Sequence, residues 1–144
     1  LLANPDIQVT PDDIMAAHMH FREALQIRQS SPLFHLQTAE DVQARLSFPN
    51  SGEDQTAGVI MIKLSDDIEG LPQLDPNYAT IIVIINADDQ PFTYVDETIA
   101  GAGFVLHPVQ QASFDSIVQT ASYDSAISAF TVPARTTAVF VLPR

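Results

Sequence analysis

The sequence predicts a mainly β protein, an antiparallel β-sandwich that follows one long and one short α-helix. Apolar residues recur at helical spacing before residue 45, and about seven short apolar or β-branched segments come after it. Turn-rich linkers separate these segments, and no helix alternates with them as it would in a parallel βαβ fold. Two helices followed by a run of short strands are typical of a sandwich with a helical N-terminal approach.

The long helix is predicted over residues 11–29. Thr10 can cap its first turn, Pro11 suits the first helical position, and the two aspartates that follow complement the helix dipole. One face carries an apolar stripe, which consists of Ile14, Ala17, Phe21, Ala24 and Leu25. Other apolar residues lie outside the stripe: Met15, Met19 and Ile27. Because such a helix is often contacted on two sides, we expect the rest of a larger protein to cover it.

The segment 30–32, Ser-Ser-Pro, ends the long helix, because the residue before a proline is disfavoured in the α region. Three large apolar residues follow at once: Leu33, Phe34 and Leu36. We expect them to enter a core between the helix and the sandwich. A capping-box-like pattern at 38–41 then starts a short helix over about residues 39–44.

Strands are predicted over residues 45–48, 58–64, 80–86, 92–95, 103–106, 129–132 and 136–142. The clearest is 80–86 (TIIVIIN), whose unbroken apolar run indicates a strand that is buried on both faces. We expect the last two strands to form a closing hairpin whose turn holds residues 133–135.

Composition and charge limit the classes of function. The 144 residues are 46% hydrophobic and include no cysteine, so one domain-sized core is expected and disulfides and thiolate metal sites are excluded. The net charge of −12 argues against nucleic acid and anionic membranes as partners, because both attract clustered lysines and arginines. No apolar run is long enough to span a bilayer. Since the first residue is not methionine, we expect the chain to be a fragment of a longer protein.

The sequence contains no convincing catalytic or metal site. Three pairs of adjacent acids could suggest a glycosidase: Asp66-Asp67, Asp88-Asp89 and Asp96-Glu97. Each pair lies in a predicted turn, and we expect both acids of each pair to point into water. His18 and His20 do not share a helix face and so make a poor metal pair. Residues 66–70 lack the alternating oxygen ligands of a calcium loop. We therefore predict no catalytic residue, metal or cofactor.

Aromatic residues are the remaining candidates for a binding site, because sugar-binding modules stack aromatic rings on pyranose faces. The chain has no tryptophan, and most of its eight phenylalanines fall in apolar strands and in the long helix. The tyrosines Tyr78, Tyr94 and Tyr123 are therefore the candidate carbohydrate-binding residues.

Five segments resemble a known family. They are FREALQIRQSSPLF (21–34) and the stretches 36–64, 74–87, 106–113 and 130–141. The first is similar to the final barrel helix, and its exit, in enzymes of the α-amylase superfamily. All five resemble the C-terminal domain of bacterial pullulanase-type α-1,6-glucosidases, to which plant limit dextrinases are related. Pro49 departs from the pattern, because a polar residue such as histidine is expected there.

The resemblance implies that residues 1–32 are the end of a (β/α)8 catalytic barrel and that residues 33–144 form a Greek-key-like C-terminal β-sandwich. The parent enzymes hydrolyse α-1,6 bonds in pullulan, glycogen and amylopectin with carboxylates on barrel loops. Those barrel motifs do not occur in residues 1–144, and any calcium of the parent would be bound outside them. The resemblance implies a bacterial parent, for which secretion, a place at the cell surface and an intracellular location all stay open.

Three hypotheses of function follow. The first is a non-catalytic domain that packs on the barrel of the same polypeptide and stabilises it. The second is an accessory module that binds α-glucan, for which at least one of the three tyrosines has to be exposed. The third, hydrolysis by the fragment itself, is expected to fail.

Overall fold

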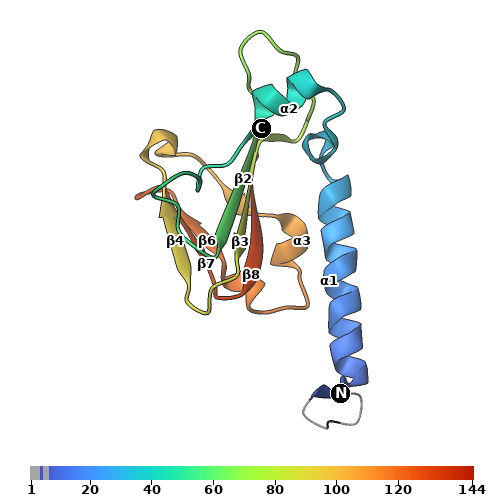
Figure 1. Ribbon diagram of the computed structural model, residues 1–144. Coiled ribbons are helices and arrows are strands. Elements are labelled where there is room, and N and C mark those ends of the chain that lie inside the picture. Colours follow the sequence, from blue (N-terminus) through green and yellow to red (C-terminus); the bar gives the residue numbers. More distant parts are fainter. Residues whose placement is uncertain (1–3, 5–6) are drawn as a thin grey trace.

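A computed structural model describes residue 4 and residues 7–144. The chain forms three layers: a sheet of three strands, a sheet of five strands, and the long helix α1 (Figure 1). The large sheet has the order β1-β2-β3-β8-β5, and the small sheet has the order β4-β7-β6. All paired strands are antiparallel, which confirms the predicted antiparallel sandwich.

The helices of the described residues are α1 (Pro11–Gln29), α2 (Ala39–Arg45) and α3 (Pro108–Gln111), with 3₁₀ turns at Pro32–His35, Glu97–Ile99 and Val118–Thr120. The strands are β1 (Leu46–Ser47), β2 (Val59–Ser65), β3 (Tyr78–Asn86), β4 (Phe92–Val95), β5 (Val105–Leu106), β6 (Ser122–Asp124), β7 (Ala129–Val132) and β8 (Thr136–Pro143). None of these helices is both long and apolar enough to cross a membrane.

Helix α1 has the predicted bounds, and a capping box explains where it starts. The hydroxyl of Thr10 accepts a hydrogen bond from the backbone N–H of Asp13 (3.2 Å). The carboxylate of Asp13 accepts one in return from the N–H of Thr10 (2.8 Å). These bonds hold the pKa of Asp13 below its ordinary value. At the other end the N–H of Ser30 bonds the carbonyl of Ile27, and Pro32 prevents a further turn.

Strand β3 is the centre of the large sheet and is buried on both faces, as its apolar run predicts. Ile82 and Ile84 point into the inner core, which lies between the two sheets. Ile81 points the other way into the outer core, which lies between the large sheet and the end of α1. Successive side chains of a strand alternate between its faces, so one strand contributes to both cores.

The predicted closing hairpin is wrong. Strand β7 lies in the small sheet and β8 in the large sheet, so the two do not pair with each other. The turn between them is held by the β3–β4 connection instead. The amide of Asn86 donates to the carbonyls of Gln90 (2.8 Å) and Pro133 (2.9 Å), and the N–H of Arg135 donates to the carbonyl of Asp88 (2.9 Å). The β3–β4 connection and the β7–β8 connection therefore both cross from one sheet to the other, and hydrogen bonds join the two connections.

Two short elements escaped prediction, namely β6 and α3, because three or four residues carry too little periodicity to reveal them. Helix α3 protects an open edge of the large sheet. Its Gln110 donates to the carbonyl of Thr137 (2.8 Å) and accepts from the N–H of Val139 (2.7 Å), both on β8. The Gln110 side chain thus takes the place of a paired strand along β8 beyond the point where β5 ends. The backbone groups of β8 that it bonds are therefore not exposed as a free edge.

A cluster of aromatic rings lies among the aliphatic residues of the inner core. Phe130 packs edge-on against Phe104 (5.2 Å between centroids) and Phe140 (5.0 Å). The outer core is aliphatic and includes Leu33, which is 1% exposed. Phe34 and Leu36 are half-buried against it, which confirms that the residues after Pro32 enter a core between helix and sandwich.

The inner core supports a first prediction. Phe130→Ala should lower the free energy of unfolding of the chain by about 3–5 kcal/mol, because the substitution leaves a cavity among three aromatic rings. The change would be measured by urea unfolding. Phe48→Ala, at a phenylalanine that is 51% exposed, is the matched control and should cost less than about 1 kcal/mol. Similar losses for both variants would contradict the assignment of the core.

Candidate functional site

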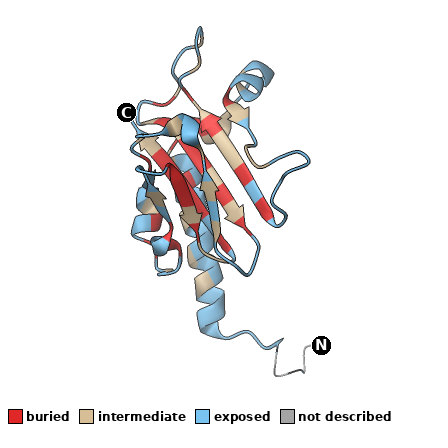
Figure 2. Ribbon diagram, turned by 90° about the vertical axis from the view of Figure 1, so that its left-hand side faces the viewer, coloured by how far each residue is buried: buried red, intermediate tan, exposed pale blue. Residues whose placement is uncertain are grey.

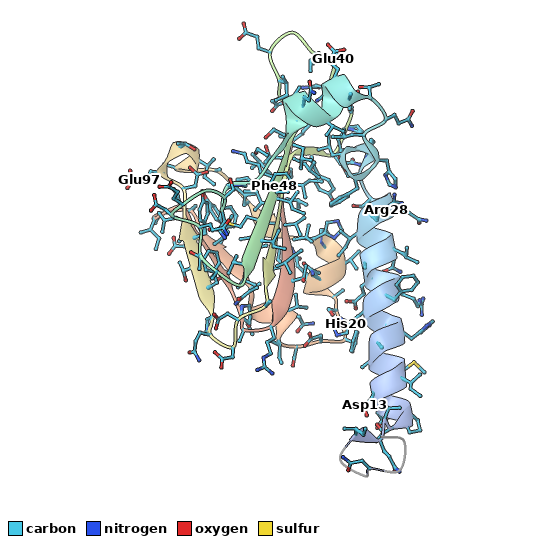
Figure 3. All side chains as sticks on the ribbon, in the orientation of Figure 1. Asp13, His20, Arg28, Glu40, Phe48 and Glu97 are labelled. Atoms are coloured by element: carbon cyan, nitrogen blue, oxygen red, sulfur yellow. The ribbon has the colours of Figure 1, made fainter. Side chains whose placement is uncertain are left out.

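Helix α1 contacts the sandwich along a narrow and partly polar face (Figure 3). Glu23 accepts hydrogen bonds from the hydroxyl of Ser113 (2.9 Å) and the N–H of Phe114 (3.4 Å). The ring of His20 meets that of Phe114 edge-on at 4.7 Å. Helix α1 has one buried residue, Ile27. Polar bonds and one aliphatic anchor therefore attach the helix to its own domain.

The larger apolar residues of α1 point away from the sandwich. Phe21 is 64% exposed, Ile14 62%, Met15 58% and Leu25 42%. Figure 2 shows the helix mostly in the colour of exposed residues, whereas the strands carry most of the buried ones. The large residues of the predicted stripe, Ile14, Phe21 and Leu25, thus face solvent, together with Met15 from outside the stripe. Contiguous exposed apolar surface of this kind marks an interaction site more often than a free surface.

The joint after α1 is fixed by a buried pair of polar residues. The hydroxyl of Ser31 donates a hydrogen bond to the carboxylate of Asp75, and both residues are 1% exposed. The same hydroxyl accepts from the N–H of Leu33 (3.1 Å), and Asp75 accepts from the N–H groups of Asn77 (2.8 Å) and Tyr78 (3.2 Å). The direction in which the chain leaves the helix is therefore tied to the start of β3.

His107 forms a second tie at the joint. Its Nδ1 accepts from the N–H of Val109 (3.2 Å), so in the neutral ring the proton lies on Nε2, which bonds the hydroxyl of Ser30 (3.0 Å). Ser30 in turn donates to the carbonyl of Ile27 (2.7 Å). Burial lowers the pKa of His107 to about 4. The pair resembles a serine nucleophile with its base only in composition, because the hydroxyl proton is engaged by the backbone and, among the described residues, no carboxylate bonds the ring.

A network of charges lies where the sequence predicts a solvated turn. Asp66 and Arg45 are fully buried and form an ion pair of 2.6 Å. Arg144 adds a bond to Asp66 (2.7 Å) and another to Asp67 (2.8 Å). Burial alone would raise the pKa of Asp66, but N–H donors from Leu74 and the next residue, together with the two arginines, hold it below the ordinary value.

The prediction that both acids of the 66–67 pair point into water is therefore wrong for Asp66, although Asp67 is 59% exposed. The other two pairs serve turns. Asp88 accepts from the N–H of Gln90 (3.0 Å), and Asp96 caps the 3₁₀ turn that follows it. Among the described residues no group of three or more histidine and acid side chains is arranged to hold a metal ion. These carboxylates act as structural acceptors.

Two of the three candidate tyrosines share a row of the small sheet, because Tyr94 on β4 and Tyr123 on β6 both lie opposite Phe130 of β7, whereas Tyr78 lies in the large sheet. Tyr78 is half-buried against the outer core, and its ring lies 6.0 Å from that of His107. Tyr94 and Tyr123 are half-buried against the inner core from β4 and β6. The hydroxyl of Tyr123 donates to the carbonyl of Ile99 (3.2 Å). Their role in carbohydrate binding stays a prediction.

Sequence reasoning missed the residues that fix the joint and the ion network, above all Asp75 at the joint and Arg45 and Arg144 in the network. Their partners lie 44, 21 and 78 positions away along the chain. Periodicity cannot reveal contacts at such separations. One signal could have pointed to the ion network. The chain has 6 basic residues against 18 acids, so its few arginines are candidates for neutralising a buried acid.

Comparison with known families decides what kind of domain this is. The family described as alpha-1,6-glucosidases, pullulanase-type, C-terminal matches residues 1–143. The chain belongs to this family. Chloroplastic pullulanase 1 of Arabidopsis thaliana is 42% identical over 99% of the chain, and a pullulanase of Klebsiella pneumoniae is 31% identical over 86% of it. The chain spans only 15% and 11% of the lengths of these two relatives.

Solved structures of pullulanases agree with the family assignment. PulA from Klebsiella oxytoca matches 92% of the chain with a TM-score of 0.84 and 29% identity, and the chain covers 12% of that protein. PulA from Klebsiella pneumoniae in its maltotriose complex matches 92% of the chain with a TM-score of 0.83 and 30% identity, and 14% of that protein is covered. The predicted resemblance and the mainly β fold are confirmed.

The ion network of this pullulanase-type domain gives a second prediction. Asp66→Asn should lower the free energy of unfolding by about 3–5 kcal/mol, because the buried Arg45 and the partly buried Arg144 lose a shared counter-charge. Asp67→Asn, at the exposed neighbour, should cost less than about 1 kcal/mol. Urea unfolding of both variants measures the difference, and equal losses would show that the network contributes nothing specific.

The buried histidine gives a third prediction. The unfolded chain takes up a proton at His107 near pH 6.5, whereas the folded domain does so only near pH 4. The unfolded state therefore binds more protons across this window, and stability should fall by up to about 3 kcal/mol as the pH drops through it. The loss is complete below the folded pKa.

Urea unfolding at several pH values in this window would measure the loss. The control is His107→Gln, which has no proton to take up at this position. The stability difference between the two proteins should change across the window and stay constant above it. Parallel pH profiles for both proteins would contradict the prediction.

Proposed function

We propose that this domain is a non-catalytic part of an enzyme that hydrolyses α-1,6-glucosidic bonds, and that it stabilises the catalytic barrel by packing on it. The proposal takes the activity from the pullulanases to which the chain is similar. The chain covers a small share of each relative, which leaves room for a separate catalytic region. Asp66, Asp88 and Asp96, one from each acid pair, are engaged in the ion network, a turn and a cap, as expected of a supporting domain.

The single observation that carries the proposal is the outward stripe of α1. Phe21 and Ile14 expose nearly two thirds of their surface in this domain. Burying a side chain of this size is worth about 1.5–3 kcal/mol, so a partner surface over the stripe gains several such contributions. The proposal also assigns the domain boundary. Residues 1–32 belong to the barrel as its final helix, and residues 33–144 form the sandwich behind it.

A fourth prediction tests this packing. In the full-length parent enzyme, Phe21→Ser combined with Leu25→Ser should lower the melting temperature by several degrees, because two buried side chains lose their apolar contact. In the isolated chain of residues 1–144, where both side chains are exposed, the same double variant should change unfolding little.

The matched control is Gln43→Ser, at an exposed polar residue of α2. Thermal unfolding of the parent with each variant, followed together with hydrolysis of pullulan, provides the measurement. A parent enzyme that keeps its melting temperature with both stripe residues changed would remove the scaffold role.

A further inference from the structure

A hollow of about 450 Å³ lies at the β1 edge of the large sheet, between the loop 48–58 and strands β2 and β3. This loop joins β1 to β2. Strand β1 pairs with β2 only at Lys63 and Leu64, so the first part of β2 has no strand beside it on that side. The loop and the hollow occupy the place of the missing strand.

The side chain of Asn50 holds the loop in its shape. Its amide group donates to the carbonyls of Thr56 (3.0 Å) and Val59 (2.7 Å), and its oxygen accepts from the N–H of Thr56 (2.8 Å). The bond to Val59 satisfies a carbonyl of β2, so the loop protects the unpaired part of that strand. A wall that is already formed also loses less conformational entropy when it binds a ligand.

Phe48 and Ile60 are the apolar residues of the hollow that are open to solvent. Phe48, which is labelled in Figure 3, is 51% exposed, and Ile60 is 54% exposed. Protection of the strand edge explains the bonds of Asn50, but it does not require an exposed aromatic ring. The other exposed phenylalanines have a place, since Phe21 belongs to the outward stripe and Phe114 packs on a ring of α1. Among the described residues Phe48 has no aromatic partner.

The polar part of the hollow is uncharged. Its amide and hydroxyl side chains are those of Asn50, Ser51, Gln55 and Thr56. None of the described residues that line the hollow carries a charge, and the two acids of the loop, residues 53–54, lie outside the lining. The side chains of Gln55 and Thr56 have no hydrogen-bond partner among the described residues, so both can bind a ligand.

We propose that this hollow binds a neutral oligosaccharide, with a sugar ring on the side chain of Phe48 and sugar hydroxyls bonded to Gln55 and Thr56. A sugar offers both surfaces that such a site needs. Its C–H groups form an apolar face that packs on an aromatic ring, and its hydroxyls exchange hydrogen bonds with neutral amides and hydroxyls. A charged ligand would find no counter-charge here. The volume lies within the range of about 300–1,000 Å³ that is typical of small-molecule sites.

The assignment to a neutral sugar rests on the hollow, whereas the choice of an α-glucan rests on the proposed function, in which the parent enzyme acts on such chains. Phe48 also suits the task better than the three candidate tyrosines, which are half-buried against the two cores. A glucan held here makes a second contact besides the one in the catalytic region. Two linked contacts raise the effective concentration of the glucan at the enzyme.

Nuclear magnetic resonance titration of the chain 1–144 with maltotriose tests the proposal. The amide signals of residues 48–60 should shift and reach saturation. Phe48→Ala should raise the dissociation constant about tenfold, because the variant loses the ring on which the sugar packs. Phe48→Tyr keeps an aromatic ring and should bind like the original chain. Gln55→Ala removes one bonding group and should weaken binding to a smaller extent.

Two controls accompany the titration. Ile127→Ala changes an apolar residue that is 61% exposed outside the hollow, and it should leave the affinity unchanged. Urea unfolding shows whether each variant remains folded, which is expected because the side chains of Phe48 and Gln55 are exposed. Cellotriose, a β-linked trisaccharide of the same composition, should bind more weakly than maltotriose. Equal binding of both sugars would remove the assignment to an α-glucan.

Three results would overturn the proposal. The first is a titration in which residues 48–60 do not shift. The second is binding that neither Phe48→Ala nor Gln55→Ala weakens, which would place the sugar elsewhere on the domain. The third is a lower melting temperature of the full-length parent with Phe48→Ala and no sugar binding, which would make the hollow an interface within the polypeptide. If the variants at Phe21 and Leu25 still destabilise the parent, the scaffold role survives and the sugar site alone fails.

Discussion

Strand β3 has to bury both of its faces, because its apolar residues run without interruption from Ile81 to Ile85. One face is covered by the small sheet, whose Phe130 packs against Phe104 and Phe140 in the inner core. The other face requires a second cover, which the sandwich does not supply by itself. Ile27 and Leu33, from the end of α1 and the turn after it, provide that cover. The attachment of the helix is therefore part of the fold of the sandwich, because Ile27 completes the apolar cover over the outer face of β3.

Buried polar contacts then decide the direction of α1. Apolar contacts alone are not directional, and a helix could lie over the sheet at several angles. The bond from Ser31 to Asp75 and the chain from His107 through Ser30 fix the last turn. Glu23 fixes the middle of the helix against the segment after α3. Polar contacts thus hold one side of the helix against the sandwich, while its larger apolar residues stay exposed on the other side. This arrangement suits an element shared between two domains.

Much of the fold could be predicted from the sequence, and the reason differs from element to element. The capping residue Thr10 and the stop at Pro32 are local signals, so the bounds of α1 were predicted correctly. The burial of β3 on both faces followed from composition. The pairing of β7 and β8 was wrong, because proximity along the chain favoured a hairpin whereas Asn86 ties their turn to another connection. The burial of Asp66 was missed for a similar reason, since its partners come from both ends of the domain.

The sequence by itself determined the bounds of α1, the approximate positions of most strands, which strand is buried on both faces, and to which family the chain belongs. These properties depend on side-chain periodicity, on capping and proline, and on similarity along the chain. Only the tertiary structure decided which side of α1 faces the sandwich and which carboxylates are buried. Those properties depend on contacts between residues far apart in the chain, and no local pattern encodes which partners the fold brings together.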